Sequence, residues 1–452
     1  MMYKKLKKEF NNSSDLKYKK INNVRVIYLE SLCSSNRINE YIIKNIALKK
    51  NYLNLRDIIS GPSIVYLEDI KQASYYLHNG YALIYDDKDL LVCEVKADLY
   101  RGISMPTVEP GVNGPKDSFN ESIQTNLGLI KRRIKTGDLI NRDFTLGKTT
   151  KSLISLLYIK DLPQSDLIED VSNKLEKLQE YDVIDIEAII EKMNPGYNPL
   201  PTILKTERPD VVCSALLDGK IAIIGDNSPY VLIIPAFLVD FVNPQGDKYV
   251  KPISANFMKI IRFMCLIITL TLPGLYLAII NYNPEAIPLS LLLSFQASRS
   301  GVPFSSALEC IFMIFISTIL RESDIRFPSN YGSPISIIGA LVLGEAAVAA
   351  SLVSPIMIIV VGITFITGLV FSNGEIINGF KFFRLLILIM SCVLGLYGFL
   401  VGCFITLIVF ASTNSFGKPY LFPITPFNKS YFFESVLKKR KKNNLWKELF
   451  FC

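Results

Sequence analysis

Two acidic residues lie inside long apolar stretches, where a carboxylate has few stabilising neighbours. Glu345 lies within Ile335–Phe371, and Glu309 lies within Phe304–Leu320. An acidic side chain in such a stretch is costly if it faces lipid, so it must meet a partner, be protonated or line water. Glu309 is expected near the membrane interface and is therefore the weaker of the two candidates for a functional carboxylate.

The stretch that holds Glu345 is too long for one membrane-spanning helix, because a span takes ~20 mainly apolar residues. We expect it to break near Ser354 and Pro355, since proline donates no backbone hydrogen bond to a helix. Gly339 and Gly344 precede the glutamate and favour a backbone that bends around a cavity. Ser354 and Pro355 are therefore predicted to form a membrane helix break.

The residues that an enzyme site needs are missing or isolated. His78 is the one histidine, and beside Asn79-Gly80 it is expected at the surface end of a helix. The 8 cysteines are scattered singly without a CxxC motif, which is typical of reduced structural thiols. Gly111–Lys116 fails the spacing of a phosphate loop, and Pro115 removes a backbone N–H that such a loop uses. We predict no catalytic, cofactor-binding or metal site, and no enzyme.

The chain divides into two parts of different composition. Hydrophobic residues are 50% of its 452 residues and charged residues 20%, but charge is frequent in residues 1–252 and sparse in 263–412. Long apolar runs confined to one end predict an α/β soluble head followed by an α-helical multi-span membrane domain. The expected crossings are Phe263–Ile280, Phe304–Leu320, the two parts of Ile335–Phe371, and Leu385–Ala411.

The number of crossings is expected to be four to six. Leu289–Phe295 is too short to cross alone, so it is predicted to be re-entrant or interfacial. Gly395, Gly398 and Gly402 in the last span permit close contact between helices. The basic tail around Lys438–Lys442 should be cytoplasmic, and a head without an export signal should lie on the same side. An even number, four or six, satisfies both.

One pattern occurs twice in the head. A helical segment, a glycine, a strand, a tight turn and a second strand follow one another over residues 69–95 and again over 209–234. Two similar α/β subdomains are the natural inference, with Gly80 and Gly219 in corresponding helix-to-strand turns. Chance similarity between two hairpins is the alternative.

These patterns give five predicted regions. Residues 1–35 are expected to be a mobile basic lead-in, 36–160 and 161–250 the two subdomains, 251–412 the transmembrane domain and 413–452 a basic cytoplasmic tail. The net charge of +8 is concentrated at the two ends. Without interleaved aromatics or a zinc pattern, it indicates solvated or lipid-facing ends and no nucleic-acid binding.

Several stretches, in one order, resemble the A subunit of the GerA-type germinant receptors of endospore-forming bacteria. The sequence is also similar to the stage V sporulation AF relatives, which share this architecture. Ala349–Ser351 and Asn243–Lys251 depart from the family pattern. The stretches that carry the resemblance are Gly114–Asn126, Leu129–Ile134, Glu207–Asp210, Leu217–Ile224, Ser228–Tyr230, Gly301–Phe304, Ser336–Val348, Val353–Pro355 and Ser415–Leu421.

The resemblance implies a two-subdomain cytoplasmic head and residence in the spore inner membrane. It also implies an oligomer, such as a pentamer, that releases ions when nutrients are sensed. The implied partners are a transporter-like B subunit that binds the germinant and a lipoprotein C subunit, besides membrane lipid. No cofactor is implied.

An ion path follows from such an oligomer. In a ring of identical chains Glu345 would form a ring of carboxylates, which suits cation passage, with Glu309 as the second candidate. Alternatively, Glu345 pairs with a polar or cationic group at a subunit contact, or touches the B subunit. A secondary transporter, or a structural or signalling membrane subunit without its own pore, is the alternative function.

Overall fold

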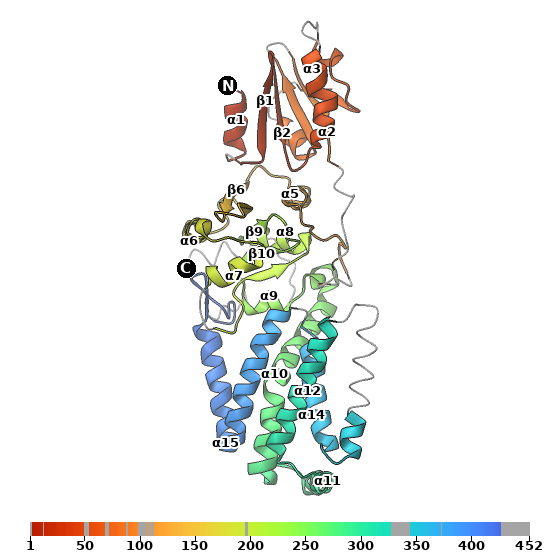
Figure 1. Ribbon diagram of the computed structural model, residues 1–452, viewed down its shortest axis with the longest axis vertical. Coiled ribbons are helices and arrows are strands. Elements are labelled where there is room, and N and C mark those ends of the chain that lie inside the picture. The colour runs from red at the N-terminus through yellow and green to blue at the C-terminus, as the bar shows by residue number, and fades with distance from the viewer. Residues whose placement is uncertain are drawn as a thin grey trace.

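Three layers follow one another along the long axis of the molecule: two β-sheets with their helices, and then a helical part (Figure 1). The computed structural model describes residues 2–11, 13–48, 54–67, 72–86, 89–97, 106, 109, 113–194, 198–326, 344–371 and 373–425. All element bounds and counts below refer to these residues.

The first subdomain contains an antiparallel sheet in the order β1-β2-β4-β5-β3. Its strands are β1 (Leu16–Ile21), β2 (Val24–Leu29), β3 (Ile64–Tyr66), β4 (Tyr81–Tyr85) and β5 (Leu90–Glu94). Its helices are α1 (Met2–Glu9), α2 (Ser35–Ile38), η1 (Asn39–Ile43), α3 (Lys44–Leu48), η2 (Leu55–Asp57) and α4 (Ala73–His78).

The expectation of a mobile segment over residues 1–35 is wrong, because this segment supplies a helix and two strands. Leu6 of α1 and the following Phe10 are buried in the core of the sheet. β1 exposes Lys19 and Lys20, as a lysine-protected edge strand does. Its lysines gave the segment the composition of a solvated tail.

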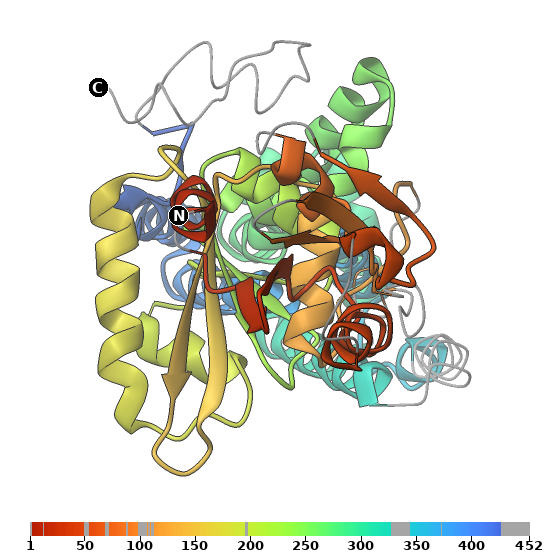
Figure 2. The ribbon, with the colours of Figure 1, turned by 90° about the horizontal axis from the view of Figure 1, so that it is seen from above.

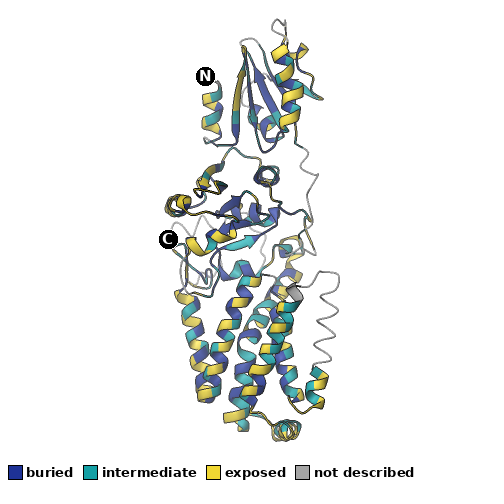
Figure 3. Ribbon diagram, in the orientation of Figure 1, coloured by how far each residue is buried: buried dark blue, intermediate teal, exposed yellow. Residues whose placement is uncertain are grey.

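The second subdomain repeats the sheet in the order β6-β7-β9-β10-β8. Its strands are β6 (Leu139–Leu146), β7 (Ser152–Ile159), β8 (Leu204–Thr206), β9 (Ile221–Gly225) and β10 (Val231–Ile234). Its helices are α5 (Ile123–Lys131), α6 (Ser165–Lys177), η4 (Leu178–Glu180), α7 (Glu187–Met193) and α8 (Pro209–Leu217). α5 and α8 cover one face, whereas α6 and α7 cover the other, so β9 and β10 are fully buried (Figures 2 and 3).

The predicted boundary at residue 160 is also wrong. β6 and β7 were expected in the first subdomain, but β7 pairs with β9, from Ile154 opposite Gly225 to Leu157 opposite Ala222. Pairing between strands distant in sequence therefore assigns this hairpin to the second sheet.

The two subdomains have the same succession of elements. In each, a helix precedes a β-hairpin, further helices lead to an edge strand, and a short helix leads to a second hairpin. Gly80 follows α4 and Gly219 follows α8, with φ of 80° and 82°. This left-handed conformation favours glycine after a helix. The prediction of a shared fold with these glycines in corresponding turns is confirmed.

A linker connects the head to the helical part. Two described helices, α10 and α15, are long and apolar enough to cross a membrane, and α14 is shorter but also apolar. The linker contains α9 (Leu238–Val242) and η5 (Gln245–Tyr249). The helical part contains α10 (Pro252–Tyr282), η6 (Pro284–Ala286), α11 (Leu289–Arg299), α12 (Ser306–Arg326), α14 (Pro355–Leu369) and α15 (Gly374–Ser412). Two short strands follow it, β11 (Asn414–Ser415) and β12 (Lys418–Pro419).

α15 is a helical hairpin rather than the single span expected over Leu385–Ala411. Its backbone reverses at Gly395, with φ 61° and ψ −135°, in a region that glycine adopts readily. The second arm then packs against the first so closely that a Cβ on Gly402 would lie 3.0 Å from the Cα of Ile387. The glycines therefore permit close helix contact, as predicted, but within one chain.

Both ends of the helical part rest on the second subdomain. α10 continues from the linker, and after α15 the Ser415 Oγ donates a hydrogen bond to Thr202 O at 2.9 Å. Asn198 Nδ2 also donates to Thr413 Oγ1 at 2.7 Å. α10, α12, α14 and the two arms of α15 therefore run between the head and the opposite end, where α11 lies across the bundle (Figure 1).

Candidate functional sites

The structure brings Glu309 and Ser354 together at a helix start. Glu309 is 1% exposed, and its Oε1 accepts hydrogen bonds from Ser354 N at 2.6 Å and Ser354 Oγ at 2.5 Å. α14 begins at Pro355 with Ser354 as its N-cap. A carboxylate at a helix N-terminus is stabilised by the free N–H groups and the helix dipole. Glu309 therefore anchors α12 to the first turn of α14.

Glu309 also faces a cation across the bundle. Its Oε2 lies 3.9 Å from the Nε of Arg299, the last residue of α11. Neither atom has a hydrogen-bond partner among the described residues. The cluster joins α11, α12 and α14 at the end of the bundle remote from the head.

Glu345 takes no part in the hydrogen bonds or the ion pair of this cluster. It belongs to a short helical stretch over residues 344–349, and its side chain is exposed. It has no hydrogen bond or ion pair to another residue in the described part of the chain. The two predicted carboxylates therefore differ: Glu309 holds the helix break internally, whereas the side chain of Glu345 is exposed.

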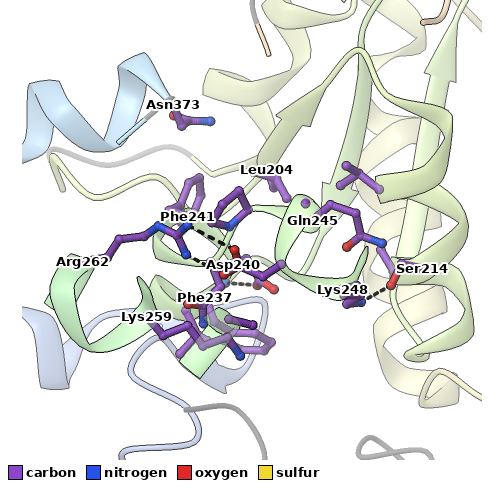
Figure 4. Close-up of a pocket in the computed structure, with 18 of the residues that line it drawn as sticks. Leu204, Ser214, Phe237, Asp240, Phe241, Gln245, Lys248, Lys259, Arg262 and Asn373 are labelled. Carbon is purple, nitrogen blue, oxygen red and sulfur yellow. Dashed lines mark hydrogen bonds and ion pairs between the residues drawn. The ribbon is translucent and has the colours of Figure 1, made fainter. Parts of the chain in front are cut away.

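A cavity of about 640 Å³ lies where the head meets the helical part; we call it the junction cavity (Figure 4). The second subdomain, the linker and the start of α10 form its walls. Among the lining residues Arg208, Asp218 and Lys220 belong to stretches that carry the sequence resemblance, whereas Lys248, Lys259 and Arg262 come from the linker and α10.

Ion pairs cross this junction. Lys220 of the head pairs with Asp240 of the linker at 2.5 Å, and the Arg262 Nη2 of α10 donates to Asp247 Oδ1 at 3.1 Å. Lys248 Nζ lies 3.6 Å from Asp218. Sequence reasoning did not single these residues out as a site, because the partners lie in separate elements and none is a catalytic motif.

Glu109 is a carboxylate in the cavity wall whose pKa is raised by its surroundings. Burial is the largest cause that raises the pKa of Glu109, and the negative charge of Glu207 also raises it. A hydrogen bond of 2.6 Å from Thr206 Oγ1 lowers this pKa, and the balance brings it to about 7. Its backbone N–H donates to Glu207 Oε1 at 2.9 Å. The junction therefore contains a group that changes charge near neutral pH.

The two subdomains meet at a contact that we call the subdomain seam, around a buried ion pair of Asp15 and Lys131. Asp15 also accepts hydrogen bonds from the N–H and hydroxyl of Ser31 at 2.8 Å and 2.7 Å. Burial alone would raise the pKa of Asp15, but Lys131 and Ser31 outweigh it and keep this pKa below its usual range.

His78 lies in the same seam, so the expectation of a surface position is wrong. It is 7% exposed, and its ring stacks on Phe10 with centroids 5.1 Å apart. Burial, and next the charge of Lys131, lower the pKa of His78 to about 4. Its ring nitrogens have no hydrogen-bond partner within the described residues. His78 is thus a neutral packing residue.

Comparison with known proteins places the chain in a family. Residues 4–447 match the family described as Bacillus/Clostridium GerA spore germination protein. Spore germination protein KA of Bacillus subtilis (strain 168) is 33% identical over 443 residues, covering 93% of this chain and 81% of the relative. Spore germination protein A1 of the same organism is 33% identical over 346 residues, covering 76% and 71%.

A solved structure is also similar: the N-terminal domain of the A subunit of the Bacillus megaterium spore germinant receptor GerK3. It is 26% identical, with a TM-score of 0.40, and the similarity covers 53% of this chain and 95% of that one. The protein belongs to the GerA family of spore germination proteins.

Proposed function

We propose that this chain is the A-type membrane subunit of a germinant receptor, and that it assembles into an oligomeric, ligand-gated cation channel in the spore inner membrane. Its partners would be a transporter-like B subunit, a lipoprotein C subunit and membrane lipid. Family membership supports the role in germination. The channel, its oligomer and its ion path are the further steps of the proposal.

One observation carries the membrane assignment: large apolar side chains of the helical part are exposed. Phe404 is 66% exposed and Leu407 63% in α15, and Met264 is 56% exposed in α10 (Figure 3). Soluble monomers rarely leave such continuous apolar surface in contact with water. Lipid and neighbouring subunits would cover it.

The connectivity of the described helices supports an even number of crossings, four or six. The chain enters α10 and leaves α15 at the head, so the number of crossings is even. α12 ends on the head side, where Arg321 lies beside Gly368 near the end of α14, whereas Gly344 lies beside Ile358 near the opposite end. The head and the chain that follows α15 then share the cytoplasmic, or spore-core, side.

Glu345 is the preferred ion-path residue because its carboxylate is exposed in the single chain and sits close to the break before α14. Glu345→Gln and Glu345→Ala should slow potassium release after germinant addition by about tenfold, which corresponds to ~1.4 kcal/mol on the barrier. Protein level is measured separately. Glu285→Gln, an exposed glutamate of η6 on the same side of the bundle, is the matched control.

Glu309→Gln should behave differently, since it weakens the anchor of α14. We expect lower assembly of the protein rather than slower release per assembled receptor. If both Glu345 variants assemble normally and release ions at the wild-type rate, Glu345 does not belong to the ion path.

A secondary transporter is the second candidate, and the break at Ser354-Pro355 favours it, because transporters build substrate sites at discontinuous helices. Flux through proteoliposomes separates the two. Passive ion current without coupled substrate uptake supports the channel, whereas substrate-coupled uptake supports the transporter. If neither activity is detected, the result supports a structural or signalling subunit without its own pore.

A further inference from the structure

We propose that α1 and β1 of the first subdomain form a binding surface for single-stranded nucleic acid. Four lysines and two tyrosines gather on these two neighbouring elements, and we call them the lysine–tyrosine surface. Its members are Tyr3, Lys4, Lys7 and Lys8 of α1, and Tyr18 and Lys20 of β1.

α1 turns one side toward the sheet and another toward solvent. Leu6 and the following Phe10 are buried against the strands. Residues three or four apart are neighbours on a helix, so Lys4, Lys7 and Lys8 lie side by side. Lys4 and Lys8 are exposed, and neither forms an ion pair with a described residue. The outward side of α1 is therefore basic.

A pair of aromatic rings joins this side of α1 to β1. Tyr3 stacks on Tyr18 with ring centroids 4.6 Å apart and an interplanar angle of 29°. Lys7 Nζ lies 5.9 Å from the centre of the Tyr3 ring. Tyr18 is 38% exposed, and Lys20, two residues further on the same face of β1, is also exposed. Lysines from both elements therefore flank one stacked pair.

Protection of an edge strand explains only part of this surface. It accounts for Lys20, because lysines on an edge strand prevent pairing with another chain. It does not account for the lysines of α1 or for the exposed ring of Tyr18. The sequence argument against nucleic acid rested on the absence of aromatic residues interleaved with the lysines. The fold supplies them by placing α1 beside β1.

Lysines and aromatic rings together are the chemistry that holds single strands. Lysine side chains attract the phosphates, and an aromatic ring stacks with an unpaired base of any sequence. Bases in a duplex already stack on one another, so an exposed tyrosine favours a single strand.

The carboxylates nearest in the chain or in the sheet lie outside the lysine–tyrosine surface. They are Glu9, which lies beside Lys5 on the other flank of α1; Asp15, which pairs with Lys131; Glu30, which pairs with Lys17; and Asp86 and Asp87, which follow β4, a strand that β2 separates from β1.

The position favours nucleic acid over lipid as the polyanion. α1 and β1 belong to the outermost layer, and the second subdomain separates them from the helical part (Figure 1). A membrane around the helical part would therefore lie at the other end of the molecule. Contact with nucleic acid in the cell rests on the proposed cytoplasmic side of the head, whereas binding by the purified protein does not.

The test uses the full-length protein in nanodiscs of neutral lipid and a fluorescein-labelled oligothymidylate. Fluorescence anisotropy measures the binding constant K at several salt concentrations. Lys4→Gln, Lys8→Gln and Lys20→Gln combined should weaken binding by about tenfold or more. They should also reduce the slope of log K against log salt by about 2, because each lost phosphate contact removes ~0.7.

The tyrosine is tested separately. Tyr18→Leu keeps an apolar side chain without an aromatic ring, so it should weaken binding by about fivefold and leave the salt slope unchanged. Tyr18→Phe keeps the ring and should bind like the wild type. Thermal unfolding of each variant checks that it folds.

A matched control removes the same charge elsewhere. Lys151→Gln, Lys160→Gln and Lys177→Gln combined change three exposed lysines of the second subdomain and should bind like the wild type. Equal weakening by this control would mean that overall charge binds the oligonucleotide, and it overturns the proposal. Unchanged binding in Tyr18→Leu does the same.

Two competitors decide between nucleic acid and other polyanions. Polyglutamate and phosphatidylglycerol vesicles are each added at the same concentration of charge as unlabelled oligothymidylate. Displacement by the oligothymidylate alone supports the proposal. Equal displacement by polyglutamate would assign the surface to an acidic protein, and equal displacement by the vesicles would assign it to a membrane; either result overturns it.

Discussion

The same turn makes different contacts in the two subdomains. In the first, the turn after α4 meets the second subdomain, where Asn79 Oδ1 accepts a hydrogen bond from Lys135 Nζ at 2.8 Å. In the second, the turn after α8 meets the linker, where Lys220 pairs with Asp240 and Asp218 lies 3.6 Å from Lys248. Each copy therefore rests its helix-to-strand turn on the layer that follows it in the chain.

The two contacts differ in how they are filled. The subdomain seam contains the buried pair of Asp15 and Lys131 beside the stacked ring of His78. The junction keeps a cavity of about 640 Å³ bordered by ion pairs. Beside this cavity the junction is also packed: Leu200 of the second subdomain shares one buried apolar cluster with Phe380 and Ile387 of α15. The seam therefore rests on a buried charge pair, whereas the junction combines buried apolar packing with an open cavity.

Removing one partner of the buried pair should have the largest effect. Lys131→Met leaves Asp15 buried without its counter-charge and should lower the free energy of opening the first subdomain by about 3–5 kcal/mol. Native-state hydrogen exchange of β1, β2 and α5 in the full-length protein measures this.

Two variants control this experiment. Asp15→Leu with Lys131→Met should restore most of the loss, since no unpaired charge remains. Lys17→Met breaks a surface ion pair in which the side chains of Lys17 and Glu30 are 43% and 39% exposed. It should lower the free energy of opening by less than about 1 kcal/mol. If Lys131→Met is as mild as Lys17→Met, the pair does not hold the seam.

Acid should weaken the seam next. Unfolded His78 takes up a proton near pH 6.5, but in the fold its pKa is lowered to about 4. The stability that depends on neutral His78 is therefore fully present above pH 6.5. It is lost as the pH falls toward 4, by about 3 kcal/mol at most. Hydrogen exchange of α4 and β4 between pH 7 and 4 measures it. His78→Phe keeps a ring against Phe10 and should flatten the profile; an unchanged profile would assign the acid response to other groups.

The junction should respond to pH in the opposite direction and more weakly. The pKa of Glu109 is raised from 4.5 to about 7, so the fold favours its protonated form. The stability that depends on protonated Glu109 is present below pH 4.5 and is lost as the pH rises through 7. The loss should be about 1–2 kcal/mol, because Glu109 is only partly buried. Glu109→Gln should remove this dependence from exchange at β8 and η5, whereas Glu180→Gln, on an exposed side chain, should not. Identical profiles for the two variants would contradict the assignment.

Local patterns in the sequence determined the kinds of element and the division into head and helices. The repeated helix, glycine and hairpin were visible because strand alternation, helix ends and left-handed glycines depend on neighbouring residues. The charge-poor carboxy-terminal half predicted long apolar helices for a similar reason. The break before α14 follows from a single proline.

Tertiary structure decided which distant segments meet. β7 joins the second sheet through β9, Asp15 reaches Lys131 across 116 residues, and Glu309 reaches Ser354 across 45. A strand or a charged side chain specifies its own chemistry but not its partner, because register and burial depend on packing over the whole fold. The reversal at Gly395 was equally hidden, since a glycine between two apolar runs is compatible with one long helix or with two packed arms.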